Sequence, residues 1–226
     1  MNQHKQIWNN FCARMQILES STLLFRHSED LIVETKTIGV KSQRSVLCRS
    51  IEMEQMVCSE SDKLVDDWEN EKDEFDGLIY MMFLRDLSKV LPLYIGKAET
   101  IGKRNRNLSA NIKNLHSNTQ NFARWGDNYA YHIGDLSAVA LPGHDPSKKS
   151  RKYLNWAKVL FLEFPTSRPQ LKQEVYFWTT AWKKTTVGIW ESFGPTRITF
   201  LEYLMIGVAS SVFPSLLLNR EGQNRG

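Results

Sequence analysis

The chain has 226 residues, of which 42% are hydrophobic and 24% are charged, with 12 Gly and 7 Pro. This composition excludes collagen-like, coiled-coil and wholly disordered proteins. The three cysteines form neither a paired framework nor a CxxC zinc pattern, which is typical of a reduced cytoplasmic protein. The most apolar stretch, residues 203–218, is interrupted by polar residues and is shorter than the ~20 residues of a membrane span. We therefore expect a cytoplasmic globular protein.

Charge divides the chain into two parts. Residues 1–76 hold 9 Lys and Arg against 15 Asp and Glu, a net charge of −6, whereas residues 77–226 hold 20 against 10, a net charge of +10. The acidic run over residues 52–76 forms either a solvated helix face or an acidic cover over a basic groove. The basic excess over residues 97–158 suits a polyanionic partner, because phosphates must be neutralised. We expect an acidic N-terminal extension over residues 1–76.

The first half of the chain predicts a helix, two short extended pieces and a hairpin. The helix is expected over residues 5–18, an apolar piece over 22–25 and a strand-like piece over 31–33. After the acidic run, residues 78–84 form an apolar run of strand length, and residues 92–96 form a second strand. The connection between these two strands is short, so we expect them to pair as an antiparallel hairpin.

The second half of the chain predicts helices around one more strand. Residues 102–115 place Leu108, Ile112 and Leu115 on one face of an amphipathic helix. The remaining elements are, in chain order, a turn-rich stretch with a short strand over 121–141, a turn over 142–146, a helix over 153–164, a buried strand over 174–182 and a helix over 199–211.

Two tripeptides fall on the predicted hairpin, Leu78-Ile79-Tyr80 and Tyr94-Ile95-Gly96, and Arg104 follows ten residues after Tyr94. This layout resembles the GIY-YIG nucleases, whose two motifs lie on adjacent antiparallel strands and whose catalytic arginine follows the second motif. Three further residues match elements of that family in order: Lys97, Glu202 at the start of the last helix, and Asn219 after a proline. The resemblance covers residues 77–222.

The resemblance implies an α/β (α+β) fold for residues 77–222, with a small, mainly antiparallel three-stranded sheet flanked by helices and an insertion at about residues 121–164. It also implies a metal-dependent endonuclease that hydrolyses phosphodiester bonds in DNA. The expected setting is restriction or another defence against foreign DNA, because no separate DNA-binding module is recognisable.

The resemblance assigns roles that suit this chemistry. Glu202 would hold one Mg²⁺ or Mn²⁺, and Arg104 would present a permanent planar cation to the phosphate. Tyr94 would activate the attacking water, either as a phenolate beside the metal or Lys97, or by hydrogen bonding; Tyr80 would assist. Asn219 would fix the site by hydrogen bonds. The catalytic residues that we expect are Tyr80, Tyr94, Lys97, Arg104, Glu202 and Asn219, with Glu202 as the metal ligand.

Two departures from the family pattern carry consequences. Gly77 stands one residue too early for the first tripeptide, so a bulge or a relaxed motif is needed. Leu108 occupies a position where family members often carry His or Tyr for proton transfer. His116 or His132 could supply that group in space, or either could be a structural histidine.

The partner is expected to be double-stranded DNA, without a membrane or a small-molecule cofactor and with the oligomeric state left open, a dimer included. Two alternatives stay open: a catalytically weak nucleic-acid-binding protein of the same fold, and an RNA-cleaving toxin. The residues that we expect to contact nucleic acid are Lys103, Arg106, Arg124, Lys148, Lys149, Arg151 and Lys152.

Overall fold

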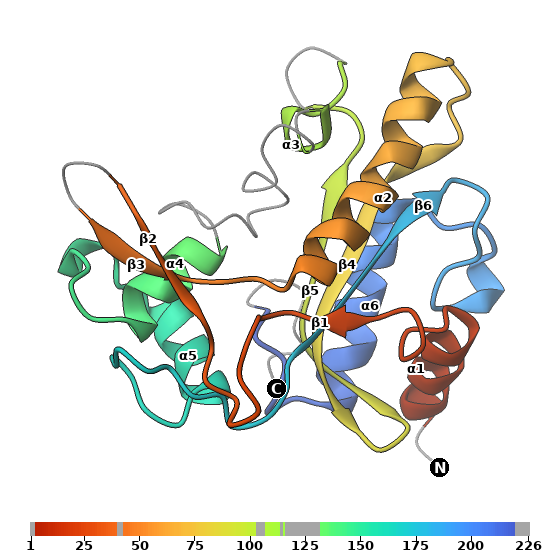
Figure 1. The fold of residues 1–226 in the computed structure, drawn as a ribbon. Coiled ribbons are helices and arrows are strands. Elements are labelled where there is room, and N and C mark those ends of the chain that lie inside the picture. Colours follow the sequence, from red (N-terminus) through yellow and green to blue (C-terminus); the bar gives the residue numbers. More distant parts are fainter. Residues whose placement is uncertain (1–2, 40–42, 103–106, 114, 116–131, 220–226) are drawn as a thin grey trace.

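A four-stranded antiparallel sheet with the strand order β1-β6-β4-β5 forms the centre of the computed structural model, which describes residues 3–39, 43–102, 107–113, 115 and 132–219 (Figure 1). A separate two-stranded antiparallel sheet joins β2 to β3. The fold is mixed α+β, as predicted, but the main sheet has four strands because β1 pairs with β6. The strands are β1 (Thr22–Leu23), β2 (Thr35–Ile38), β3 (Arg44–Leu47), β4 (Phe75–Asp86), β5 (Lys89–Glu99) and β6 (Tyr176–Lys183).

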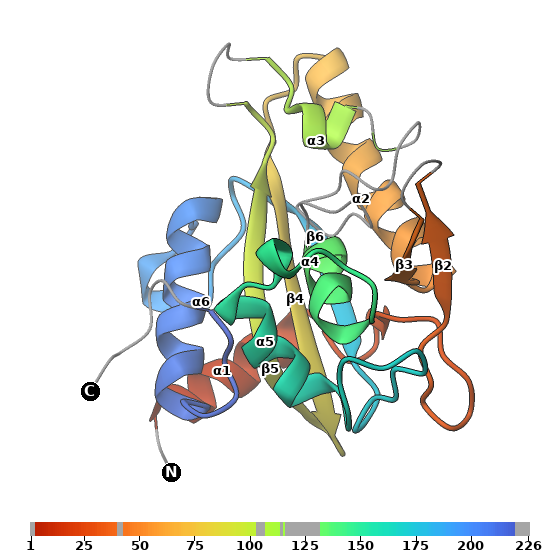
Figure 2. The same cartoon turned by 90° about the vertical axis from the view of Figure 1, so that its left-hand side faces the viewer.

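Helices cover both faces of the main sheet (Figures 1 and 2). On one side, here called the α6 face, lie α1 (Gln3–Arg14) and α6 (Ile198–Val212). On the other, here called the α5 face, lie α2 (Ile51–Glu69), α4 (His132–Ala140) and α5 (Arg151–Leu160). The short helices are α3 (Ala110–Lys113), η2 (Pro146–Lys148) and η3 (Glu191–Phe193).

The sequence of β4 explains why both faces are covered. Successive side chains of a strand point to opposite faces. Ile79 and Met81 accordingly belong to the cluster under α6, while Leu78, Tyr80 and Met82 belong to the cluster under α5. All five are buried, so a helical layer on each side is needed to exclude water from this strand.

The residues before Gly77 complete this same core. Trp8 of α1 is fully buried on the α6 face, and Met53, Val57 and Leu64 line the inner side of α2 on the α5 face. Most of the acidic residues over 52–76 lie on α2, an amphipathic helix with a buried side. The boundary predicted at residues 76–77 falls inside β4, and hydrophobic residues before it pack against the sheet.

Most of the other predicted elements are found close to their expected bounds. The hairpin of β4 and β5 is present, and α1, α5, β6 and α6 match the predicted helices and strand. The expectation of a short strand and loops over 121–141 is wrong for its described part, because residues 132–140 form α4. Of the helix predicted over 102–115, only α3 is helical among the described residues. Leu108 forms an isolated antiparallel bridge with Ile101, and Arg104 lies outside the described residues.

One negative finding concerns membranes. Within the part of the chain that the structure describes, no helix has both the length and the apolar character that a bilayer crossing requires.

Candidate functional site

The two tripeptides face each other across the β4–β5 pair. Tyr80 is the register partner of Gly96, and Tyr94 is the partner of Met82. A Cβ atom built on Gly96 would lie 2.6 Å from the Tyr80 ring, much closer than a real contact. The Tyr80 ring therefore occupies the space above Gly96, and only glycine fits at that position of β5.

The displaced glycine of the first tripeptide coincides with an irregularity in the sheet. The pairing of β4 with β6 shifts register between Phe75 and Gly77, just before the glycine, whereas residues 77–80 pair with β5 and β6 without a shift. Gly77 has φ +152°, and a Cβ atom there would lie 2.2 Å from the carbonyl oxygen of Ala98. Gly77 is therefore held between two strands where a side chain cannot fit.

A second irregularity lies directly before Tyr94. Met82 pairs with Tyr94 and Phe83 pairs with Pro92, so Leu93 has no register partner on β4. An extra residue in one strand redirects the side chains that follow it, and such bulges are common beside functional sites. The result is that Leu93 and Tyr94 both pack on the α5 face, with the Tyr94 ring centroid 6.4 Å from that of Tyr80.

The rest of the Tyr94 environment comes from α4 and α5. His132 and Trp156 each place their ring centroids 5.1 Å from that of Tyr94, and His132 Nδ1 lies 2.7 Å from the Tyr153 hydroxyl. The Lys152 Nζ atom lies 5.2 Å from the centre of the Tyr94 ring. The chain thus brings His132, one of the two histidines considered for proton transfer, next to Tyr94. His132 is 2% exposed, so a direct contact with a phosphodiester is excluded in this arrangement.

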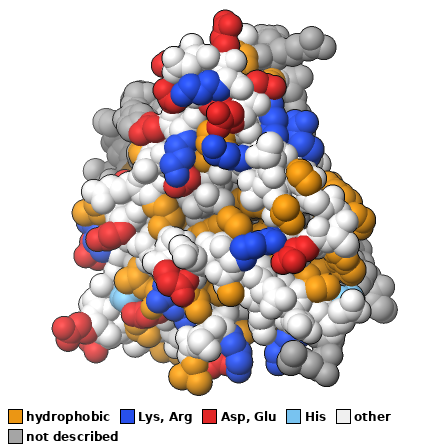
Figure 3. All heavy atoms as spheres, turned by 90° about the vertical axis from the view of Figure 1, so that its right-hand side faces the viewer, with side chains coloured by type: hydrophobic (Ala, Val, Ile, Leu, Met, Phe, Trp, Pro, Cys, Tyr) orange, Lys and Arg blue, Asp and Glu red, His pale blue; other side chains and the backbone are white. Residues whose placement is uncertain are grey.

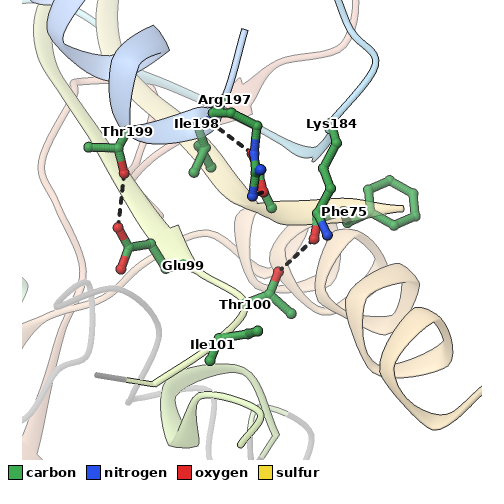
Figure 4. Close-up of a pocket in the computed structure, with 9 residues that line it drawn as sticks. Phe75, Glu99, Thr100, Ile101, Lys184, Arg197, Ile198 and Thr199 are labelled. Atoms are coloured by element: carbon green, nitrogen blue, oxygen red, sulfur yellow. Dashed lines mark hydrogen bonds and ion pairs between the residues drawn. The ribbon is translucent and has the colours of Figure 1, made fainter. Parts of the chain in front are cut away.

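Lys97 lies on the opposite face of β5. Its ammonium donates hydrogen bonds to the Thr199 hydroxyl at 2.8 Å and to the Glu99 carboxylate. Thr199 also donates to Glu99 at 3.0 Å, a bond that Figure 4 shows. Sequence reasoning missed Glu99 and Thr199. The period of two along a strand places Glu99 on the same side as Lys97 and was an available signal.

Glu202 is half-buried on α6, three residues after Thr199. Residues three apart are neighbours on a helix surface, so Glu202 lies one turn beyond the Lys97–Glu99–Thr199 cluster. No three His, Cys, Asp or Glu side chains within the described ranges are grouped as a metal cage. Mg²⁺ often uses only one or two carboxylates with water and phosphate oxygens, so Glu202 and Glu99 have suitable donor chemistry.

Asn219 is bound to the backbone of the second tripeptide. Its side-chain oxygen accepts a hydrogen bond from the Ile95 N–H at 2.9 Å, and its side-chain amide donates to the Ile95 carbonyl at 2.8 Å. The neighbouring Leu218 N–H donates to the Leu93 carbonyl at 2.7 Å. These bonds attach residues 218 and 219 to the edge strand β5 on both sides of Tyr94.

A pocket of about 210 Å³ opens beside Glu99 and Thr199 (Figure 4). It lies between the start of β4, the end of β5 and the first turn of α6, and it also takes in Lys184 and Arg197. A hydrogen bond from Arg197 to Asp76 raises the pKa of the guanidinium above its usual value, so this group stays charged.

The residues expected to contact nucleic acid fall into three groups. Lys148, Lys149 and Arg151 are exposed around η2 and the start of α5. Lys152 is half-buried, and its ammonium lies over the rings of Tyr94, Tyr153 and Trp156. Those outside the described residues are Lys103, Arg106 and Arg124, together with the catalytic Arg104.

Acidic residues at the end of α2 and before β4 pair with lysines. Lys72 contacts Asp66 at 2.7 Å, Lys183 contacts Glu74 at 2.8 Å, and Lys184 contacts Asp73. Figure 3 shows acidic and basic side chains next to each other over the upper part of this side of the molecule. Part of the acidic run therefore neutralises neighbouring cations. Lys72 belongs to the run itself, Lys183 ends β6 and Lys184 follows it, so all three lie outside the basic stretch 97–158.

A comparison of the chain with models of protein families, with curated proteins and with solved structures finds no match.

Proposed function

We propose that this protein is a metal-dependent endonuclease of the GIY-YIG type, which hydrolyses phosphodiester bonds in double-stranded DNA and serves restriction or another defence against foreign DNA. One observation carries the proposal. The two tripeptides lie on paired antiparallel strands, with the Tyr80 ring directly over Gly96 and with Asn219 bound to Ile95 between Tyr94 and Gly96. This supports the resemblance, which rests otherwise on the order of residues in the sequence.

The proposed catalytic side chains lie on both faces of β5, with Lys97 on the α6 face and Tyr94 on the α5 face. A Mg²⁺ ion at Glu202 would neutralise phosphate charge and provide acidified water. Lys97, which donates to Thr199 one helical turn before Glu202 and to Glu99, presents a cation that can contact a phosphate oxygen. Tyr94, a residue of β5 itself, packs on the α5 face, where its hydroxyl would orient water by hydrogen bonding or, as the phenolate, accept a proton. Arg104 would stabilise the charge on the phosphate in the transition state.

A second candidate is favoured by a specific observation. Tyr80 is only 3% exposed, and Leu108, at the position where the family often has a proton-transfer residue, packs against the core of the α5 face. A protein with this fold that binds nucleic acid and turns over poorly is consistent with both facts. An RNA substrate in place of DNA is the remaining alternative.

One experiment separates these candidates. The purified protein is incubated with supercoiled plasmid and, separately, with structured RNA, in Mg²⁺ and in EDTA. We expect Mg²⁺-dependent cleavage of the plasmid. We expect Glu202→Gln to abolish cleavage while DNA binding in Ca²⁺ persists, because the amide keeps the helix and removes the anionic ligand. The loss should exceed the roughly 10- to 100-fold that removal of a partner of a metal ligand costs.

The matched control is Glu191→Gln, which removes an exposed carboxylate paired with Arg14. It should cleave like the natural protein. Cleavage of RNA alone would replace the DNA proposal with the RNA alternative. DNA binding without cleavage of either substrate would favour the weak binder, and a fully active Glu202→Gln variant would remove Glu202 from the site.

A further inference from the structure

The start of α6 lacks a cap from its own sequence. The first N–H groups of a helix have no intrahelical partner and are usually satisfied by the side chain of the residue before the helix. That residue here is Arg197, which makes no such bond. The Ile198 N–H instead donates to the Asp76 carboxylate at 3.2 Å. The cap of α6 is therefore supplied by β4, 122 residues earlier in the chain.

Asp76 also holds Arg197 in a two-pronged ion pair. The Nε and Nη2 atoms of Arg197 donate to the two carboxylate oxygens of Asp76, both at 2.5 Å. The Asp76 side chain is 5% exposed, whereas that of Arg197 is 67% exposed. Two parallel hydrogen bonds from a planar guanidinium to one carboxylate fix the orientation of both groups as well as the distance between them. One buried carboxylate thus sets both the backbone and the side chain at the first residues of α6.

Asp76 is itself held firmly. Its carbonyl accepts a hydrogen bond from the Thr100 N–H at 2.9 Å, which ties it to the end of β5. The next residue is Gly77, at the position where no side chain fits. The carboxylate therefore projects from a point where β4 and β5 are joined and transmits the position of both strands to α6.

We infer that Asp76 is a positioning residue, which places the first turn of α6, and with it Thr199 and Glu202, against Lys97 and Glu99. The inference rests on the proposed function. Glu202 lies four residues after Ile198, about one helical turn, so a shift of the helix start moves its carboxylate directly. An error of about 1 Å in such a group can cost ~10²-fold in rate.

A neighbouring ion pair provides the matched control. Glu74 lies two residues before Asp76 and pairs with Lys183 at 2.8 Å, with both side chains about half exposed. The Glu74 carbonyl accepts a hydrogen bond from the Lys184 N–H, and the Glu74 N–H donates to the Asp67 carboxylate at 2.9 Å. None of these contacts involves α6. Loss of this pair removes a charge from the same strand end and leaves the cap of α6 in place.

The experiment compares Asp76→Asn with Glu74→Gln in the full chain. We expect Asp76→Asn to reduce the rate of plasmid cleavage at saturating DNA by about 10- to 100-fold and to raise the Mg²⁺ concentration at half-maximal rate, as for other residues that orient a metal ligand. DNA affinity in Ca²⁺ should be unchanged. Hydrogen exchange at the amides of residues 198–201 should be faster. Glu74→Gln should change none of these quantities.

Measurements that need no cleavage separate the positioning role of Asp76 from the proposed nuclease function. Hydrogen exchange and Mn²⁺ binding by the protein alone require no cleavage, so they test the positioning of α6 even if the natural protein proves inactive on DNA. If Asp76→Asn does not fold, Arg197→Gln, which changes an exposed side chain, should show the same pattern more weakly. Unchanged exchange over residues 198–201, or an unchanged Mg²⁺ requirement in a variant with faster exchange, would overturn the inference.

Discussion

The two faces of the sheet hold the candidate site in different ways. On the α5 face, Tyr80 and Tyr94 are surrounded by rings and by other hydrophobic side chains, and Tyr80 is almost completely buried. On the α6 face, Lys97 and Glu99 are partly exposed and are held by hydrogen bonds to each other and to Thr199. One half of the site is fixed by packing, and the other half is fixed by polar contacts.

This difference indicates which changes each half tolerates. Packed rings leave no room, so even a methyl group added on the α5 face must displace something. Hydrogen-bonded polar groups at a surface can move, so the α6 face depends on how α6 itself is placed. The tyrosines should therefore respond to changes in volume, and the carboxylates should respond to changes in the anchoring of α6.

The largest effect is expected from removal of the layers that cover both faces. Deletion of residues 1–74 takes away α1 from the α6 face and α2 from the α5 face, and with them buried residues such as Trp8 and Leu64. We expect an insoluble or unfolded product, measured by yield and circular dichroism. A soluble, folded product whose DNA binding is tighter and more dependent on salt would instead support an acidic cover.

A smaller effect is expected from a single methyl group on the α5 face. Gly96→Ala places a Cβ atom 2.6 Å from the Tyr80 ring, and overpacking of this kind costs about 1–3 kcal/mol in the free energy of unfolding. Thermal unfolding should show a lower Tm, and cleavage should fall because Tyr80 and Tyr94 move.

The control for this substitution is Gly207→Ala on α6, where an added Cβ atom meets nothing within 4 Å. Alanine is the better helix former by about 1 kcal/mol, so this variant should be as stable as the natural protein or more stable. If both alanine variants behave alike, the contact between Tyr80 and Gly96 does not constrain the site.

The hydrogen bonds between Asn219 and Ile95 are tested by removing the Asn219 side chain. Asn219→Ala removes both hydrogen bonds to Ile95, and an unsatisfied buried group costs about 1–3 kcal/mol. Cleavage should fall more than stability alone explains, because Ile95 lies between Tyr94 and Gly96. Asn155→Ala, at an exposed position of α5, should leave Tm and cleavage unchanged. Normal cleavage by a destabilised Asn219→Ala variant would limit Asn219 to a structural contact.

The pattern of residues predicted the hairpin and the last helix because their signals are local. An apolar run of strand length, a short connection and a second run specify β4 and β5 without knowledge of the rest of the chain. The same patterns did not reveal that β1 adds a fourth strand, because a two-residue strand has almost no periodicity and forms by pairing with β6.

The candidate site was predictable only where its residues carry a family pattern. The family pattern indicated Lys97 and Glu202. It did not indicate Glu99, for which the period of two along β5 was the available signal, or Asp76, because an acidic residue at the start of a strand has no sequence signature. Asp76 acts on Ile198 across 122 positions of sequence, and such a contact arises only from the tertiary fold. His132 was considered as an alternative, and only the packing of α4 against β5 brings it to Tyr94.

The smallest effect concerns pH and the α5 face. His144 is buried in the loop after α4, with its Nε2 atom 2.7 Å from the Ser45 carbonyl, and burial lowers the pKa of its imidazole below the usual value near 6.5. In the unfolded chain this imidazole takes up a proton at its usual pKa, whereas the folded protein takes it up only at a lower pH. The unfolded state therefore binds more protons in this window, and the free energy of unfolding decreases as the pH falls below about 6.5.

Denaturant unfolding from pH 7.5 to 5 should show this decrease. His144→Gln should make it smaller, and Ser147→Ala in the same loop should leave it unchanged. An equally steep decrease in His144→Gln would assign the pH dependence to other groups and would leave the α5 face without a part in it.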